Sequence, residues 1–430
     1  MKILIKNGHV IDPANGRDGI MDILTDDGVI CGVGTELEVD GFEMEVIDAS
    51  GKTVVPGLVD MHCHLREPGF EYKEDIESGT RAAAMGGITS VACMPNTKPA
   101  TDNAAVITFI KERAKEAGYA DVYPIGAVSK GLQGKELAEI GEMKFAGAVA
   151  LSDDGMPVTE SWLMRRAMEY AKMFDLRVIS HCEDFGLADG GYMNEGPVAT
   201  AMGLRGISRA AEEVMVARDI IIAEAIGAPV HIAHVSTRGS VELVRQAKKR
   251  GVEVTCETCP HYFSLTDRAC EGFNTNAKMN PPLRTDDDVA AIKEGLSDGT
   301  IDCIVTDHAP HHIDEKNCEF GRALNGIVGF ETSLGLGLKY LVNEGVLTLP
   351  QLIEKMSLNP SRILDIPKGT LSEGCQADIT IFDPDKEWTV DITKFASKSK
   401  NSPFDGFKLF GKPEYVIFKG DIILNQGVIL

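Results

Sequence analysis

The segment His62-Cys63-His64 has the residue types and the spacing of a metal-binding pair. Residues i and i+2 of a β-strand share one face, so both imidazoles can hold one divalent ion. The histidines that end or directly follow short β-type runs are His62, His64, His181, His234, His261 and His308. One such histidine is more often a packing residue, but several that converge on one rim indicate a metal centre.

The elements that must position these histidines are eight short β-type runs. They cover residues 58–64, 88–96, 121–129, 147–154, 177–184, 229–236, 252–263 and 303–310. Helical patterns lie between several of them, at 74–85, 103–117, 161–174, 208–226, 240–250 and 286–297. Eight strands spread over about 300 residues, most followed by a helix, predict an α/β fold of the (β/α)8 TIM-barrel type. An open doubly wound sheet is the alternative, but no Gly-rich phosphate turn follows the first strand.

Closure of the barrel predicts two groups of metal ligands. The last strand ends at Asp307, next to the first strand with His62 and His64, whereas His181 and His234 come from the far side of the mouth. The fourth strand ends in Ser152-Asp153-Asp154-Gly155 and supplies a carboxylate between the groups. Local geometry leaves open whether Asp153 or Asp154 is the bridge.

Zinc suits a site of nitrogen and oxygen ligands with open positions for water. Two Zn²⁺ ions held close together would lower the pKa of a shared water to near neutrality. Two zinc ions, two aspartates and one hydroxide sum to a charge of about +1, which favours an anionic substrate.

The two ends of the chain have a different sequence pattern from the middle. Residues 1–55 and 367–430 contain short alternating segments punctuated by Gly and Asn-Gly. Because isolated hairpins are marginally stable, we expect both ends to form one small β-sandwich. The predicted domains are therefore 1–55 and 367–430 for the two parts of the sandwich and 56–366 for the barrel.

Composition excludes several classes of protein. The 43 basic and 65 acidic residues give a net charge of −22, which argues against nucleic acid or an anionic membrane as partner. No run approaches a membrane span, and the start lacks a signal-peptide pattern, so we expect a cytoplasmic protein. Ten scattered cysteines do not suit a disulfide scaffold, and Cys256 and Cys259 are expected to be buried, inert thiols.

At its candidate site the sequence resembles the amidohydrolase superfamily and, within it, the dihydroorotases with an aspartate at the bridging position. The motifs that carry this resemblance run nearly from end to end: 60–69 (DMHCHLREPG), 94–97 (MPNT), 180–184 (SHCED), 234–237 (HVST), 258–262 (TCPHY), 278–284 (KMNPPLR), 307–311 (DHAPH) and 402–404 (SPF). The HxH motif alone is weak evidence for this family, but HxHLREPG together with MNPPLR and DHAPH is a highly specific combination.

The resemblance implies a role for each matching residue. The metal ligands would be His62, His64, Asp154, His181, His234 and Asp307, with Asp154 as the bridge. The substrate contacts would be His64, Arg66, Asn96, Asn280, His311, Asn325 and Gly326, and Asp307 would be the catalytic proton shuttle. One or two Zn²⁺ ions per subunit are implied, with two expected, and residues 311–326 could form a mobile lid.

The activity implied by the resemblance is the reversible cyclisation of N-carbamoyl-L-aspartate to L-dihydroorotate in pyrimidine biosynthesis. A homodimer is expected from the family, and the resemblance leaves room for an association with aspartate carbamoyltransferase. A hydantoin or allantoin amidase is the first alternative, but those relatives use a carboxylated lysine where residues 149–154 contain none. A non-catalytic subunit is the second, although such proteins usually lose metal ligands and all six are present here.

Overall fold

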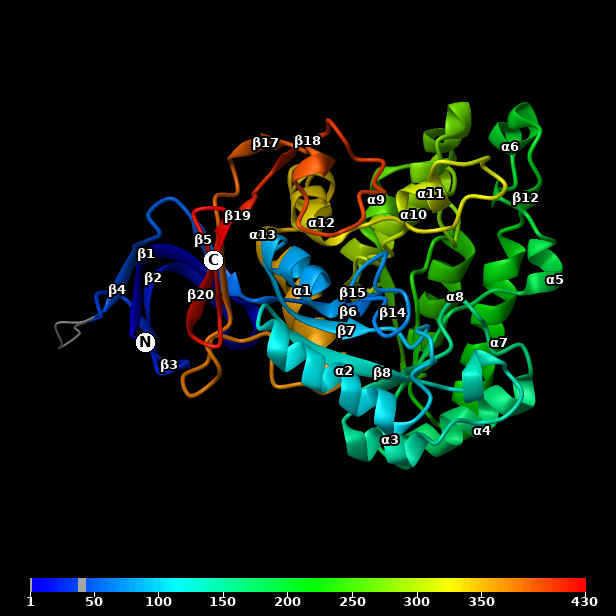
Figure 1. The fold of residues 1–430 in the computed structure, drawn as a ribbon, viewed down its shortest axis with the longest axis horizontal. Helices are drawn as coiled ribbons and strands as arrows, with labels where there is room; N and C mark the ends of the chain where they lie inside the picture. The colour runs from blue at the N-terminus through cyan, green and yellow to red at the C-terminus, as the bar shows by residue number, and fades with distance from the viewer. Residues whose placement is uncertain (1, 38–43) are drawn as a thin grey trace.

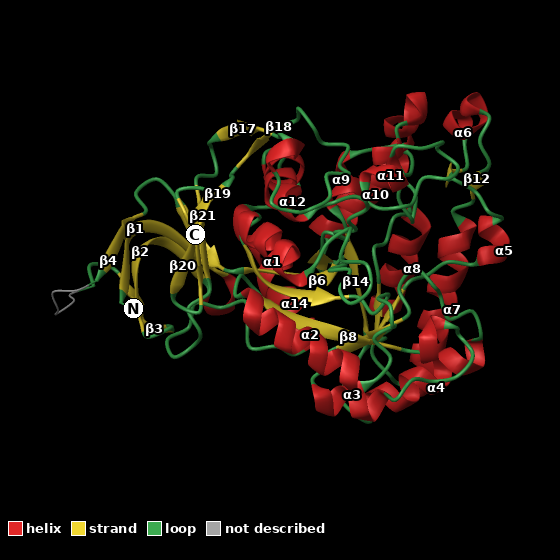
Figure 2. Cartoon of the chain, viewed as in Figure 1, coloured by secondary structure: helices red, strands yellow, loops and turns green. Residues whose placement is uncertain are grey.

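Eight parallel strands form a barrel in the computed structural model, which describes residues 2–37 and 44–430 (Figure 1, Figure 2). In chain order they are β6 (Leu58–Cys63), β7 (Ile88–Cys93), β8 (Asp121–Ala127), β9 (Ala150–Ser152), β10 (Val178–Ser180), β13 (Val230–Ile232), β14 (Val254–Thr258) and β15 (Cys303–Ile304). Each of the eight predicted runs contains one of these strands. The fold class predicted from the sequence is confirmed.

The barrel closes between its first and last strands. Cys63 and His308 form a parallel bridge, and the His64 N–H donates to the His308 carbonyl at 2.8 Å. The Asp307 N–H likewise donates to the His62 carbonyl at 3.1 Å. All six residues of β6 are buried, as expected of a parallel strand with the barrel interior on one side and helices on the other.

Helices between the strands pack around the barrel, and further short helices lie in the connecting loops (Figure 2). They are α1 (Ile76–Met85), α2 (Ala104–Ala117), α3 (Ile140–Ala146), α4 (Ser161–Lys172), α5 (Phe185–Ala188), α6 (Pro197–Met202), α7 (Ala210–Ile226), α8 (Arg238–Lys249), α9 (Pro260–Ser264), α10 (Asp286–Ser297), α11 (Ile313–Lys316), α12 (Phe330–Gly337), α13 (Leu349–Ile353) and α14 (Asn359–Leu364). Two short pairs, β11 (Met193–Asn194) with β12 (Gly206–Ile207) and β17 (Glu387–Thr389) with β18 (Lys408–Phe410), lie outside the barrel.

Both ends of the chain contribute to one nine-stranded sheet beside the barrel (Figure 1). Its strands are β1 (Ile3–Asp12), β2 (Arg17–Asp26), β3 (Val29–Gly34), β4 (Glu45–Asp48), β5 (Thr53–Pro56), β16 (Ile379–Phe382), β19 (Pro413–Phe418), β20 (Asp421–Asn425) and β21 (Val428–Ile429). Side chains from both ends of the chain, including Ile3, Ile23, Ile381 and Ile417, share one core. The sequence predicts a small β-sandwich from both termini; in the structure both termini do build one β-structure, and its strands are joined as a single sheet.

The terminal sheet continues into the barrel at Gly57, between β5 and β6. The Gly57 N–H donates to the Asp378 carbonyl at 2.9 Å, and a Cβ atom at this position would lie 2.1 Å from the Thr89 hydroxyl. Only glycine fits this close approach, which fixes β6 relative to the sheet. The domain boundaries stay a prediction, and residues 1 and 38–43 of the predicted first segment lie outside the described residues.

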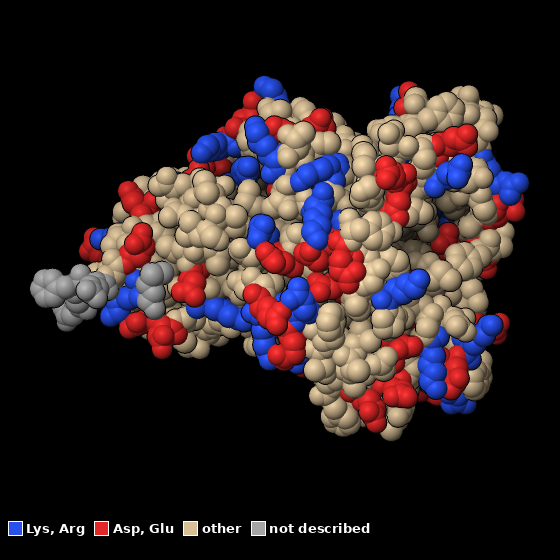
Figure 3. Space-filling model, in the orientation of Figure 1, with Lys and Arg blue, Asp and Glu red and all other residues tan. Residues whose placement is uncertain are grey.

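The surface in Figure 3 carries interspersed acidic and basic side chains. Among residues 2–37 and 44–430, no helix is long and apolar enough to cross a membrane. Cys256 and Cys259 are both buried and free, and burial raises the pKa of each thiol.

Candidate metal centre and substrate pocket

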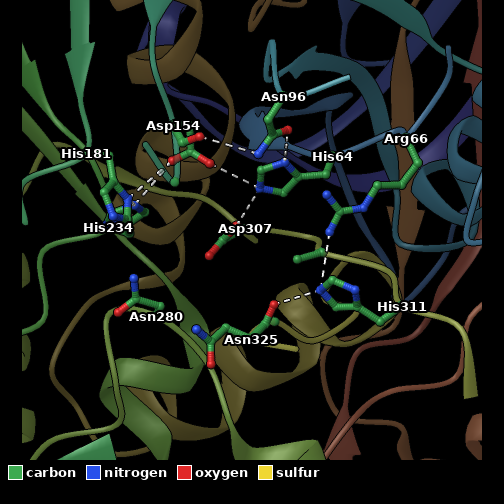
Figure 4. Close-up of a pocket in the computed structure, with 13 residues that line it drawn as sticks. His64, Arg66, Asn96, Asp154, His181, His234, Asn280, Asp307, His311 and Asn325 are labelled. Carbon is green, nitrogen blue, oxygen red and sulfur yellow. Dashed lines mark hydrogen bonds and ion pairs between the residues drawn. The ribbon is translucent and has the colours of Figure 1, made fainter. Parts of the chain in front are cut away.

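The six predicted metal ligands meet at the carboxyl ends of the barrel strands, and Figure 4 shows five of them, His64, Asp154, His181, His234 and Asp307. His62 and His64 lie at the end of β6, Asp154 after β9 and His181 after β10. His234 follows β13 and Asp307 follows β15. Parallel strands all end at the same rim, and the structure brings these side chains together there.

Two of these six residues have left-handed backbone conformations, and so does Arg66 nearby. The φ angles are 31° at His234, 47° at Asp307 and 64° at Arg66. Non-glycine residues rarely adopt such angles, because each costs about 1–3 kcal/mol of conformational free energy. Such residues persist where the surrounding structure fixes the backbone. The backbone strain therefore coincides with the rim that carries the candidate site.

The Asp154 carboxylate lies between the two groups of histidines. Its Oδ1 atom is 3.5 Å from His62 Nε2, from His181 Nδ1 and from His234 Nε2. Its Oδ2 atom is 3.5 Å from His64 Nε2. A carboxylate in this position can bind two cations at once.

Asp153, the other residue considered for the bridge, points away from the cavity. Its Oδ1 atom accepts from the N–H groups of Val128 at 2.8 Å and Ser129 at 3.0 Å, and its other oxygen accepts from the Ser129 hydroxyl. These three bonds join the β9 end to the β8 end. Asp153 therefore holds the strand ends together and leaves Asp154 to face the histidines.

Asp307 lies on the side of His62 and His64. Its Oδ1 atom is 3.1 Å from His64 Nε2 and 3.6 Å from His62 Nε2. Three potential ligand atoms on His62, His64 and Asp307 thus lie within 4.8 Å of one another, as do three on His62, Asp154 and His234. The structure forms two overlapping clusters with the donor types that zinc prefers.

The electrostatics of the clusters suit a buried cation. Burial disfavours charge on both His62 and Asp154, yet Glu257 and Asp154 hold the pKa of His62 well above its usual value. The pKa of Asp154 is correspondingly held well below its usual value, chiefly by His62. His62 Nε2 and Asp154 Oδ1 are buried and have no hydrogen-bond partner within the part of the chain that the structure describes. Unpartnered buried ligand atoms are costly unless a cation fills the space between them.

Two glutamates support the cluster from outside, and the sequence reasoning assigned neither a role. Glu257 on β14 lies 2.5 Å from His62 Nδ1, and Glu183 lies 3.2 Å from His181 Nε2. Asn280 donates to the same Glu183 oxygen at 2.9 Å. A signal for both existed, since each glutamate lies in or next to a buried strand and Glu183 is part of the SHCED motif.

A cavity of about 190 Å³ opens in front of these residues. Its lining contains His64, Arg66, Asn96, Asp154, Gly155, His181, His234, Asn280, Asp307, Ala309, His311, Asn325 and Gly326. All seven residues predicted to contact the substrate are in this list. The cavity thus has the candidate metal cluster at one end and the basic side chain of Arg66 at the other (Figure 4).

Arg66 is held at the cavity wall by the backbone. Its Nε–H donates to the Pro310 carbonyl at 3.0 Å, and burial lowers the pKa of Arg66 to about 10, so it stays charged at neutral pH. His311 lies beside it and donates from Nε2 to the Asn325 carbonyl at 2.7 Å. Burial and the cations Arg66 and Lys73 lower the pKa of His311 far below its usual value, so this histidine is neutral. The guanidinium is therefore the charged group that this wall offers to an anion.

The two remaining histidines of the predicted rim do not line the cavity. His308 stacks on Phe330 with ring centroids 3.9 Å apart, and its Nδ1 accepts from the Gly329 N–H at 3.1 Å. His261 is buried in α9, because the chain leaves β14 at Thr258, earlier than the predicted strand 252–263. His308 is a packing residue beside the site, whereas His261 forms a third group of potential ligand atoms with Cys259 and Asp307, all within 4.8 Å of one another.

Comparisons with known proteins give one consistent result. The family described as Dihydro-orotase-like matches residues 51–240. A dihydroorotase from Acetivibrio thermocellus is 63% identical over 428 residues, and one from Ruminiclostridium cellulolyticum is 61% identical over 430 residues; each match covers 100% of both chains. Among solved structures, an L-hydantoinase (dihydropyrimidinase) from Arthrobacter aurescens has a TM-score of 0.89 at 28% identity and covers 100% of this chain and 97% of its own. A D-hydantoinase (dihydropyrimidinase) from Thermus sp. has a TM-score of 0.86 at 26% identity, with 100% and 96% covered.

Proposed function

Because the chain belongs to the dihydroorotase family, we propose that it catalyses the reversible opening of L-dihydroorotate to N-carbamoyl-L-aspartate, a step of pyrimidine synthesis. The observation that supports this best is the cavity with Asp154 and Asp307 among histidines at one end and Arg66 at the other. The ring of L-dihydroorotate carries one carboxylate, which Arg66 can bind at one end of the cavity, and one amide bond to be cleaved, which the histidines and aspartates face at the other end.

The residues that would hold metal are those of the two overlapping clusters together with His181, whose Nδ1 lies 3.5 Å from Asp154 Oδ1. We assign His62, His64 and Asp307 to one Zn²⁺ and His181 and His234 to a second, with Asp154 shared between them. The unpartnered buried atoms His62 Nε2 and Asp154 Oδ1 fit this assignment. When bound, the ions would polarise the ring carbonyl and lower the pKa of the attacking water.

The protein's own groups then bind the ring and move the proton. Arg66 binds the substrate carboxylate through its guanidinium, and Asn96, Asn280, His311 and the segment Asn325–Gly326 enclose the ring. As water adds to the ring carbonyl, Asp307 accepts its proton and passes it to the ring nitrogen, whose bond to the carbonyl carbon breaks. Ring closure reverses these steps.

The alternative function is that of a hydantoin or allantoin amidase, since the similar solved structures include hydantoinases. The position of their expected carboxylated lysine is taken here by Asp154, and no lysine lies in residues 149–154. Arg66 also provides a partner for a carboxylate that hydantoin and allantoin lack. Both features favour dihydroorotate.

Ultraviolet-monitored hydrolysis by the purified protein tests the proposal with L-dihydroorotate, hydantoin and allantoin as substrates. We expect turnover of dihydroorotate alone, loss of turnover after treatment with a chelator, and recovery on addition of Zn²⁺. Metal analysis of the recovered protein gives the stoichiometry, expected to be two. Equal turnover before and after complete metal removal would contradict the proposal, as would a preference for hydantoin.

The assembly is proposed from family membership alone. We propose a homodimer that can associate with aspartate carbamoyltransferase in the cytoplasm. Sedimentation of the protein alone and mixed with that enzyme measures both interactions, and a single monomeric species in each experiment would contradict them.

A further inference from the structure

Two buried lysines lie directly behind one wall of the cavity. Lys316, the last residue of α11, is 1% exposed. Its Nζ donates to the carbonyls of Leu324 at 2.8 Å, Gly326 at 3.0 Å and Lys278 at 3.2 Å. All three ammonium hydrogens can thus be used by backbone oxygens.

Lys278 holds the same segment from its other side. Its Nζ donates to the carbonyls of Phe320 at 2.7 Å, Ala323 at 2.7 Å and Gly321 at 3.2 Å. The rings of Tyr192 and Phe320 lie 5.3 Å and 5.5 Å from this ammonium, within the range of a cation–π interaction. Five of the six carbonyls bound by the two lysines belong to residues 320–326.

Neither ammonium has a carboxylate partner among residues 2–37 and 44–430. The nearby Lys73, by contrast, pairs with Glu315 at 3.0 Å. A buried charge is unfavourable unless hydrogen bonds compensate it. Burial and the neighbouring Lys278 lower the pKa of Lys316 to about 7. The carbonyls of residues 320–326 hold the two side-chain amino groups in place by hydrogen bonds, and these groups in turn hold the segment.

The segment that the lysines hold is the one that shapes the cavity. Asn325 and Gly326 line it, and His311 donates to the Asn325 carbonyl. Gly326 packs so closely that a Cβ atom would lie 2.6 Å from the Ala309 side chain, at a φ of 127°. A small shift of residues 320–326 would change the space left for a ligand. The sequence suggested a mobile lid at 311–326, and in this structure these bonds hold its second half in place.

We propose that Lys278 and Lys316 are positioning residues for the substrate, which hold residues 320–326 in the conformation that binds it. This inference rests on the proposed function, because it assumes that an anionic ring binds in the cavity. It also assigns a role to Lys278, the first residue of the KMNPPLR motif.

The test compares Lys316→Met with Lys355→Met. Lys355 is a matched control, since it is also buried, at 7% exposed, and its Nζ donates to the Ile301 carbonyl at 2.6 Å, outside the cavity lining. Both changes remove a buried ammonium and leave a chain of similar length. Steady-state kinetics with L-dihydroorotate gives KM and kcat, and amide hydrogen exchange reports the order of residues 318–326.

We expect Lys316→Met to raise KM by about tenfold or more with kcat changed by less than about threefold, and to speed exchange in residues 318–326. Lys355→Met should leave KM and this exchange unchanged even where its melting temperature falls equally. If Lys316→Met does not fold, Lys278→Gln carries the same expectation. Wild-type KM and exchange in both Lys316→Met and Lys278→Gln, or an equal rise in KM in Lys355→Met, would overturn the inference. Absence of turnover in the wild type would instead contradict the proposed function.

Discussion

Glu257 accepts a hydrogen bond from His62 Nδ1 at 2.5 Å, and this bond determines which ring nitrogen of His62 faces the cavity. Both side chains are fully buried, and the second Glu257 oxygen lies 3.1 Å from His231 Nε2. His231 is fixed in turn by the Thr255 hydroxyl at 2.8 Å from its Nδ1. Because a carboxylate only accepts, the proton of neutral His62 stays on Nδ1 and the lone pair on Nε2 points to Asp154.

Removal of this carboxylate is expected to weaken metal binding. We predict that Glu257→Ala lowers zinc affinity about 10- to 100-fold, because groups that orient a ligand histidine have effects of that size. Glu257→Gln is the matched variant: its amide oxygen can still accept from His62, so its loss of affinity should be smaller. Competition with a chromophoric zinc chelator measures both.

The melting temperatures of the metal-free variants separate metal affinity from folding. A Glu257→Ala protein that melts like the wild type without metal but binds zinc less tightly supports the orienting role. Wild-type zinc affinity in that variant would show that His62 needs no such partner.

The proton shuttle assigned to Asp307 predicts a loss of turnover without a loss of metal. In Asp307→Asn the side chain keeps its size and an oxygen, but it can no longer accept the proton. We expect kcat to fall by at least the ~10²–10⁴-fold typical of general acid–base groups. Hydrolysis of dihydroorotate gives kcat and elemental analysis gives the metal content. Turnover near the wild-type rate in a metal-loaded variant would refute the shuttle.

The barrel and the family were predictable from the sequence because their signals are local. Strand periodicity and the i, i+2 spacing of His62 and His64 depend on neighbouring residues only. The carboxyl ends of parallel strands then gather at one rim whatever the loop details, so the order of the strands already placed Asp307 beside them and His181 and His234 across the same rim. Both the fold class and the family resemblance are confirmed.

Which of Asp153 and Asp154 faces the histidines was not predictable from local physics, because contacts with a neighbouring strand determine it. The amides of Val128 and Ser129, at the end of β8, bind the Asp153 carboxylate. Glu257 was missed for a similar reason, since its partner His62 is 195 residues away in the chain. Such contacts follow from the register between strands, which a linear pattern does not contain.

The Arg66 assignment predicts a change that depends on the substrate carboxylate. A lysine cannot both donate to the Pro310 carbonyl, as Arg66 Nε does, and offer two parallel N–H groups to a carboxylate. Loss of one charged hydrogen bond costs about 1.5–3 kcal/mol, so Arg66→Lys should raise KM for dihydroorotate roughly 10- to 100-fold.

Dihydrouracil, which lacks the carboxylate, is the control substrate for this variant. Any slow hydrolysis of dihydrouracil should be similar in the wild type and in Arg66→Lys. An unchanged KM for dihydroorotate, or an equal loss of activity with both substrates, would show that Arg66 does not bind the substrate carboxylate.

Glu331 gives the protein a pH-dependent stability that is independent of the metal centre. Its carboxyl group accepts from the Ala396 N–H at 2.8 Å and the Ser397 N–H at 3.3 Å, which connects α12 to the segment that contains Asn401. Burial raises the pKa of Glu331 from 4.5 to about 7. The folded state therefore binds the proton more tightly than the unfolded state, and its contribution to stability is largest below pH 4.5 and is lost as pH rises through 7.

The variant Glu331→Gln should lack this pH dependence, because its amide keeps the acceptor oxygen and has no proton to lose. A shift of about 2.5 pKa units corresponds to at most about 3 kcal/mol between the two limits. Urea unfolding of the metal-free proteins from pH 5 to pH 8 measures the effect. Buried Asp60 and Asp153, whose pKa values burial raises to about 7 and about 6, contribute equally to both proteins and cancel in the difference. The wild type should lose stability relative to Glu331→Gln as pH rises, and parallel curves would show that Glu331 ionises in the folded state as easily as in the unfolded chain.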